Sequence, residues 1–91
     1  MKFEWHGTKA SANLRKHAVS FDEAATVFAD FLSYVFPDPD HSDDETRFII
    51  IGMSEADRVL VVSHTDRDER TRIISAREAT RKERKYYEES C

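Results

Sequence analysis

The chain has 91 residues, of which 40% are hydrophobic and 35% are charged, and its net charge is −4. A chain of this length supports a single domain with one core of two layers, so we expect one domain over residues 1–91. Six Phe, three Tyr and one Trp argue against a disordered chain, because such chains are poor in aromatic residues. Cys91 is the only cysteine, which excludes an intramolecular disulfide and a zinc site built from cysteine spacing.

The N-terminus and the apolar runs indicate where the protein is found. Residues 1–5 contain no apolar segment of the kind that signal peptides carry, and the longest apolar run, Phe48 to Ile51, has the length of a strand. A lone cysteine suits a reducing compartment. We therefore expect a cytoplasmic protein that does not contact a membrane.

The N-terminal part of the sequence predicts one strand and two helices. Residues 3–5 alternate aromatic and polar side chains, a pattern typical of a short strand. Thr8 is the expected N-cap of a helix that ends near His17. Ser20 and Glu23 have the spacing of a capping box, and Phe and Ala residues follow them at helical spacing. We expect a second short helix here, packed on the core.

The middle of the sequence predicts several strands. Residues 32–36 favour an extended segment, which Pro37 and Pro39 would end. Three further apolar or alternating runs predict strands at residues 47–52, 58–65 and 70–74. Because short links join these three strands, we expect them to form an antiparallel meander.

A C-terminal helix completes the predicted elements. Ser75 and Glu78 have capping-box spacing, which predicts a helix from Ser75 to about Glu89. Its apolar stripe is narrow and includes Tyr86 and Tyr87, so we expect the helix at an edge of the sheet or against a partner. The sequence therefore predicts an α+β fold: an antiparallel β-sheet, made of a three-strand meander plus N-terminal strands, flanked by two short N-terminal helices and a C-terminal helix.

The charges are distributed unevenly along the chain. Residues 37–46 hold five acids and no Lys or Arg, and without them 14 basic and 13 acidic residues remain. The C-terminal third is richer in Lys and Arg than the rest. A basic face with a separate acidic loop is compatible with RNA contact. Charge alone, however, favours the simpler interpretation of a solvated surface with mixed charge.

The side chains suited to chemistry are cationic and proton-transferring groups. The four histidines lack metal-binding spacing and the two glycines cannot form a phosphate-binding loop, so we expect no metal and no other cofactor. RNA can be cleaved without a metal, because its own 2′-OH attacks the adjacent phosphate. The protein then supplies a base, an acid and cations for the growing charge. The candidates for these roles are Lys9, His17, Arg47, Arg72 and Arg77.

Each candidate also has a structural interpretation. Lys9 is compatible with a surface lysine, His17 with a helix C-cap, and Arg47 with an ion pair to the acidic loop. Arg72 suits a salt bridge at a strand edge. Arg77 fits a structural role least well, because a cation in the first turn of the expected helix opposes the helix dipole, and a bound phosphate would remove that conflict.

Two ungapped segments, with shorter motifs around them, resemble the BrnT family of bacterial toxins. The segments are KH-x-VSF over residues 16–21 and RIISAR over residues 72–77, and the resemblance extends over residues 3–87. The family usually has Asp where His6 stands and Gly where Ala18 stands. Because Ala tolerates a positive φ less well than Gly, we expect a slightly altered turn between the two N-terminal helices.

The resemblance implies a RelE-like fold and a metal-independent endoribonuclease that inhibits translation and growth by degrading RNA. It also implies neutralisation by a BrnA-type antitoxin, in which a toxin-binding segment accompanies a dimeric ribbon-helix-helix region that binds DNA. Operator DNA would then be contacted only indirectly, through the antitoxin. The residues alone leave a second hypothesis open, a module that binds protein or nucleic acid without cleavage. The overall acidity and the weakly amphipathic last helix favour that alternative.

Overall fold

The computed structural model describes residues 1–38 and 46–89, over which five strands and four helical segments form. In chain order these are β1 (Lys2–Glu4), α1 (Gly7–His17), α2 (Phe21–Thr26), the 3₁₀ helix η1 (Val27–Ala29), β2 (Tyr34–Pro37), β3 (Phe48–Met53), β4 (Val59–Arg67), β5 (Arg70–Glu78) and α3 (Arg81–Glu89). Most of the predicted acidic loop, including Pro39, lies outside the described residues. Within the described ranges, no helix is long and apolar enough to cross a membrane.

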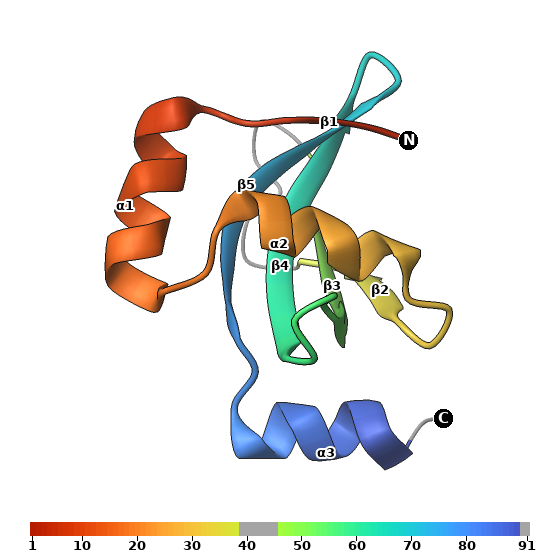
Figure 1. The fold of residues 1–91 in the computed structure, drawn as a ribbon. Helices are drawn as coiled ribbons and strands as arrows, with labels where there is room; N and C mark the ends of the chain where they lie inside the picture. Colours follow the sequence, from red (N-terminus) through yellow and green to blue (C-terminus); the bar gives the residue numbers. More distant parts are fainter. Residues whose placement is uncertain (39–45, 90–91) are drawn as a thin grey trace.

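The strands form one sheet in the order β1-β5-β4-β3-β2 (Figure 1). β3, β4 and β5 pair with antiparallel neighbours, so the predicted meander is confirmed. β2 pairs antiparallel with β3, and β1 pairs parallel with β5. The two strands that precede the meander in the chain therefore occupy opposite edges of the sheet.

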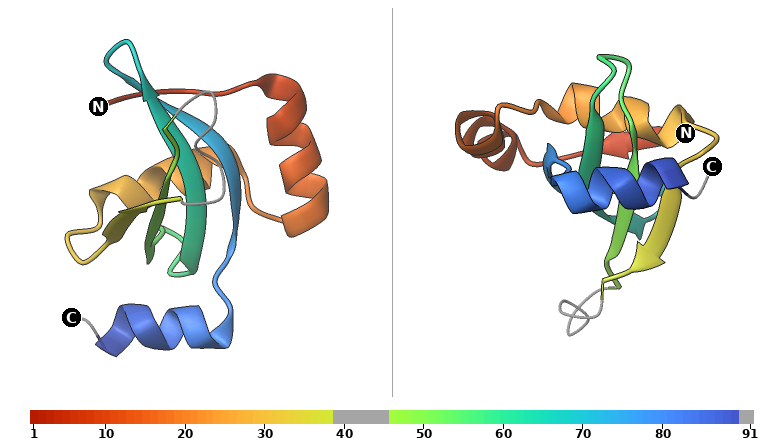
Figure 2. Two further views of the ribbon diagram at one scale, coloured as in Figure 1. Left: turned by 180° about the vertical axis from the view of Figure 1, so that it is seen from behind. Right: turned by 90° about the horizontal axis from the view of Figure 1, so that it is seen from below.

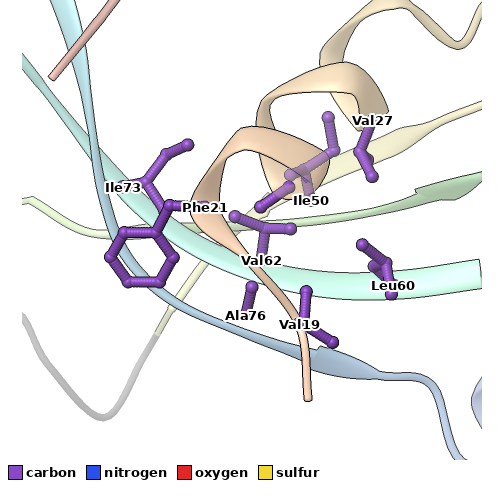
Figure 3. Close-up of a cluster of buried hydrophobic side chains, with 9 residues drawn as sticks. Val19, Phe21, Val27, Ile50, Leu60, Val62, Ile73 and Ala76 are labelled. Carbon is purple, nitrogen blue, oxygen red and sulfur yellow. The ribbon is translucent and has the colours of Figure 1, made fainter. Parts of the chain in front are cut away.

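Helices cover the sheet unequally. α2 and η1 lie over one face, α1 lies beside the β5 edge, and α3 crosses one end of the strands (Figures 1 and 2). The main core fills the space between α2 and the sheet and consists of Val19, Phe21, Ala24, Val27, Ile50, Leu60, Val62, Ile73 and Ala76 (Figure 3). A smaller cluster on the opposite face joins α3 to the sheet through Tyr87, which packs with Ile51, Val59 and Val61. Burial of each large apolar side chain contributes about 1.5–3 kcal/mol.

The prediction for the start of α1 is wrong, whereas the altered turn expected at its end is observed. The helix begins at Gly7 and its N-cap is His6, which makes no side-chain capping bond, so the predicted Thr8 N-cap is wrong. At the other end, Ala18 has φ 57° and ψ 33°, the left-handed conformation that Gly adopts without strain. The altered turn expected at this position is therefore a strained left-handed alanine.

The start of α2 follows the predicted capping motif in one half only. The Ser20 hydroxyl accepts a hydrogen bond from the Glu23 backbone N–H at 3.0 Å. The Glu23 carboxylate does not complete the box, because it accepts from the Ser54 hydroxyl at 2.6 Å and from Arg58 Nε at 3.0 Å. Glu23 therefore joins α2 to the turn that precedes β4.

The largest correction concerns residues 75–80. The predicted helix start at Ser75 is wrong, because β5 continues to Glu78 and α3 begins at Arg81. Pairing with β4 buries Ala76 opposite Val62 in the main core, and this tertiary contact overrides the local motif. The real capping box follows directly: the Glu83 N–H donates to Thr80 Oγ1 at 3.2 Å, and the Thr80 N–H donates to Glu83 Oε1 at 2.9 Å.

The Asn13 side chain of α1 forms hydrogen bonds with the β5 backbone where no strand pairs with it on that side. β1 pairs only with residues 70–72 of β5. Farther along, the Asn13 amide donates to Ala76 O at 2.8 Å and Val19 O at 2.9 Å, while the Ala76 N–H donates to Asn13 Oδ1 at 3.1 Å. Asn13 is 7% exposed, so all three bonds are shielded from water.

Asn13→Asp should destabilise the fold by roughly 3 kcal/mol or more, because it buries a charge and leaves two buried carbonyls without a donor. Urea denaturation monitored by circular dichroism measures this change. Ser11→Asp places the same charge on an exposed position of the same helix and should change the unfolding free energy by less than about 0.5 kcal/mol. Equal effects of the two variants would contradict the role assigned to Asn13.

Candidate active site

Arg72 and Arg77 lie on the same face of the sheet because β5 contains a bulge. In a regular strand, residues at an odd spacing point to opposite faces. Consecutive residues of β4 pair with Ile73 and Ser75, which leaves Ile74 as an extra residue. The bulge therefore restores both arginines to one face, opposite the face that buries the main core.

This surface, here called the arginine face, carries Arg72, Ser75 and Arg77 of β5 and Ser63 and Thr65 of β4. Ser63 and Ser75 lie directly opposite each other in register, between the two arginine positions. Both serines are half-buried, and within the described part of the chain neither hydroxyl makes a hydrogen bond. Two hydroxyl groups are thus available to a ligand between two guanidinium groups.

Arg72 is held by a carboxylate of the neighbouring strand. Its Nε donates to Glu4 Oε2 at 2.9 Å, and Glu4 lies opposite Arg72 in the parallel β1–β5 pair. Arg70 lies 3.9 Å from the other oxygen of the same carboxylate. The predicted strand-edge salt bridge is therefore present. Because the bond uses Nε, the terminal nitrogens of Arg72 keep their donors, which form no hydrogen bond to a described residue.

Arg77 is held more tightly than Arg72. Its Nη1 and Nη2 donate to the two carboxylate oxygens of Glu83 at 2.7 and 2.9 Å. This bidentate bond raises the pKa of Arg77 and lowers the pKa of Glu83 from 4.5 to about 2. The prediction that Arg77 lies in the first turn of a helix is wrong, and the conflict with a helix dipole does not arise. Arg77 instead contacts that helix through Glu83.

Lys9 and His17 lie on α1, beside β5. Each is four residues from Asn13, so helical periodicity places both on the side of α1 that Asn13 turns toward β5. Lys9 is exposed, whereas the adjacent Ala10 packs on the main core. His17 is half-buried at the end of the helix. These two candidates therefore flank β5 from outside the sheet.

Arg47 approaches the arginine face from the other side. It directly precedes β3 and its carbonyl accepts from the Asp38 N–H at 2.9 Å. The adjacent Thr46 carbonyl accepts from Thr65 Oγ1 at 2.6 Å, and Thr65 is the register partner of Arg72. Arg47 is thus separated from β5 by β4. The acids proposed to pair with it lie mostly outside the described residues.

His64 is excluded from this site by its position. It faces the main core between the rings of Phe28 and Phe48, at centroid distances of 4.8 and 5.9 Å. Burial lowers its pKa, and both ring nitrogens are buried without a partner in the described part of the chain. A neutral imidazole on the covered face cannot reach a ligand on the arginine face. Within residues 1–38 and 46–89, no group of three or more potential metal-ligating side chains forms.

Comparison with known proteins identifies the family. Residues 5–83 match the family described as ribonuclease toxin, BrnT, of type II toxin-antitoxin systems. The chain belongs to the BrnT family. The 1.1 Å crystal structure of the Brucella abortus ribonuclease toxin BrnT is similar to this structure, with a TM-score of 0.70 and 30% identity over 89% of this chain and 99% of that one. Comparison with curated proteins gives no match.

Membership of the BrnT family confirms the resemblance inferred from the two ungapped segments, and the similar crystal structure confirms the α+β fold. The protein is a ribonuclease toxin of a type II toxin-antitoxin system. This assignment decides against a module that binds RNA or protein without catalysis. The assignment of roles to individual residues rests on the geometry of the arginine face.

Four side chains on or next to the arginine face were not among the sequence candidates: Glu4, Ser63, Ser75 and Glu83. The T-x-x-E spacing of Thr80 and Glu83 was a usable signal, because it marks the true helix start. The two serines carried no comparable signal, since only the strand register brings them together.

The Arg77–Glu83 pair should make stability depend on acid pH. The folded-state pKa of Glu83 is lowered to about 2, so its contribution is complete above pH 4.5 and is lost as the pH falls toward 2. Glu83→Gln should therefore destabilise the protein at pH 7, and its difference from wild type should shrink between pH 4.5 and 2. Unfolding by urea at several pH values measures this.

Glu88→Gln is the matched control, because Glu88 is an exposed carboxylate of the same helix that forms no ion pair with a described residue. Its difference from wild type should stay flat over the same pH range. A pH-independent difference for Glu83→Gln would contradict the ion-pair explanation.

Proposed function

We propose that the arginine face is the surface on which this toxin cleaves RNA, and that Arg72 and Arg77 bind the scissile phosphodiester. The observation that carries the proposal is the β5 bulge, which directs both arginines to one face with two serine hydroxyls between them. Their register partners Thr65 and Val61 are four residues apart on β4, a separation of about 13 Å between backbone positions. Two long side chains can converge on one phosphate from that distance.

The proposed cleavage needs no metal ion. The RNA 2′-OH attacks the adjacent phosphorus, the bond to the 5′-oxygen breaks, and a 2′,3′-cyclic phosphate forms. The guanidinium groups stabilise the charge that grows on the phosphoryl oxygens, and the serine hydroxyls donate further hydrogen bonds. Lys9 and His17 flank β5 and are the proposed proton-transfer groups, while Arg47 contributes positive charge from the far side.

The two carboxylates bound to the arginines are proposed to orient them. Glu4 occupies Nε of Arg72 and leaves its terminal nitrogens for phosphate. Glu83 occupies both terminal nitrogens of Arg77, so phosphate must share or replace that bond. Arg72 is therefore the more available phosphate ligand before RNA binds, and Arg77 becomes available as the Glu83 bond loosens.

The same proposal extends to the partner and the location. A BrnA-type antitoxin with a ribbon-helix-helix region neutralises the toxin in the cytoplasm, where its RNA substrate is found. Operator DNA is contacted only through that antitoxin. A type II system pairs its toxin with an antitoxin protein, which supports this part of the proposal.

Arg72→Ala and Arg77→Ala should each lower kcat/KM for RNA cleavage by roughly 100-fold, the scale of losing one donor to a transition-state oxyanion. Arg→Lys at either position should recover only part of the loss, because Lys lacks the planar fork of donors. Arg15→Ala is the matched control, since Arg15 is an exposed α1 residue on the side away from β5. Near-wild-type cleavage by both alanine variants would remove these arginines from the active site.

Purified protein should cleave RNA in the presence of EDTA and leave a 2′,3′-cyclic phosphate end, because the side chains of the arginine face supply the charge stabilisation. Gel analysis of a labelled oligoribonucleotide, with and without phosphatase treatment that removes cyclic ends, identifies the product. Loss of cleavage in EDTA that is restored by a divalent ion would contradict the metal-free mechanism.

A further inference from the structure

An apolar groove lies between β2 and α3, beside the arginine face. Its volume is about 550 Å³, and its apolar lining comes from Tyr34, Val35, Phe36, Ile51 and Tyr86. The side chains of Tyr34 and Tyr86 meet across it with ring centroids 5.7 Å apart. The groove therefore has one wall of sheet and one wall of helix.

Exposed apolar side chains lie in the groove and in the turn before β2. Tyr86 is 55% exposed and Phe36 37%, and Phe36 shares the face of Tyr34 and Ile51 because its register partner is Ile49. Phe31 and Leu32, in the turn that leads into β2, are exposed as well. Exposed apolar side chains gathered in this way mark an interaction site more often than an ordinary surface.

The backbone of β2 adds a second, independent feature. β2 is an edge strand of the sheet, and among the described strands only β3 pairs with it. In such a strand about half of the backbone N–H and C=O groups point away from the neighbour. An edge of this kind accepts an extended segment of another chain as an added strand.

The rim of the groove carries positive charge. Lys82 of α3 lines the groove and the adjacent Arg81 is exposed, and neither forms an ion pair with a described residue. Glu83 also lines the groove, but its carboxylate is bound to Arg77. A segment that combines apolar side chains with an acidic one matches both the floor and the rim.

We propose that the antitoxin docks here by adding a strand to the outer edge of β2, with apolar side chains in the groove and an acidic side chain beside Lys82. The inference rests on the proposed function, because it takes the antitoxin as the partner. Exposed apolar side chains beside an edge strand favour a protein segment over RNA, whose phosphates match the arginine face. Since Glu83 lines the groove and also holds Arg77, the docked segment lies next to the phosphate-binding arginine and restricts RNA access to it.

Phe36→Asp tests the docking surface, because Phe36 lines the groove on β2 and its register partner Ile49 lies on the face that α3 covers, so the new carboxylate enters the groove. The Kd of the toxin for the antitoxin encoded beside it should rise by at least about 30-fold, the loss typical of a central interface residue. Leu14→Asp is the matched control: Leu14 is also a large apolar side chain, 52% exposed against 37% for Phe36, and it lies on α1, which contacts β5, a strand that β4 and β3 separate from β2. The control should change Kd by less than about 3-fold.

Amide hydrogen exchange tests the geometry. In the wild-type complex, backbone amides of residues 34–36 should exchange more slowly than in the free toxin, because an added strand pairs with them. Slower exchange confined to other elements would overturn strand addition, and an unchanged Kd for Phe36→Asp would overturn the docking surface.

Cleavage assays on the free variants separate this inference from the proposed function. Phe36→Asp should cleave RNA as wild type does, and slower cleavage would show that the groove binds RNA instead. Size-exclusion chromatography with light scattering compares the oligomeric state of the free wild type and the groove variant. If wild type self-associates and the variant does not, the groove binds a second copy of this chain, and the proposal is overturned. If wild-type toxin fails to cleave RNA, the proposed active site fails, while the affinity comparison still decides the docking surface.

Discussion

The hydrogen bonds between the Asn13 side chain and the backbone of Ala76 hold together the parts of the molecule that matter for function. They fix α1 beside β5 at the point where β1 no longer pairs with that strand. Ala76 lies between the bulge and Arg77, so the same bonds hold the strand on which Arg77 depends. Lys9 and His17 lie on α1, so the hydrogen bonds of Asn13 also fix their position beside β5. One buried amide thus links the proposed proton-transfer groups to the proposed phosphate ligands.

The sequence was most informative where side-chain pattern and tertiary packing agree. The meander was predictable because its strands alternate or are uniformly apolar and short links join them. The capping hydrogen bond of Ser20 was predictable for the same reason, since the Phe and Ala face that follows it packs on the core. Register, in contrast, is not written in any local motif. The bulge at Ile74, and with it the meeting of Ser63 and Ser75, emerges only when β4 and β5 pair.

The C-terminal region shows how a correct candidate can rest on a wrong reason. Arg77 was selected for an unfavourable position in a helix, whereas it lies in a strand and is neutralised by Glu83. The same capping spacing occurs at residues 75–78 and 80–83, and only packing of Ala76 in the core decides between them. The roles of Lys9, His17, Arg47, Arg72 and Arg77 stay predictions. Family membership assigns a ribonuclease but no individual residue.

The bulge can also be inferred from whether the spacing between the two arginines is odd or even. Two side chains on one strand share a face of a regular sheet only at an even spacing, and Arg72 and Arg77 stand at an odd one. The spacing therefore encodes a backbone irregularity that no single residue type announces. A relative that lacked the residue at position 74 would keep both arginines on one face with a regular strand, and would lose the extra twist that a bulge introduces. The number of residues between the two arginines therefore indicates whether the strand that carries them is regular or bulged.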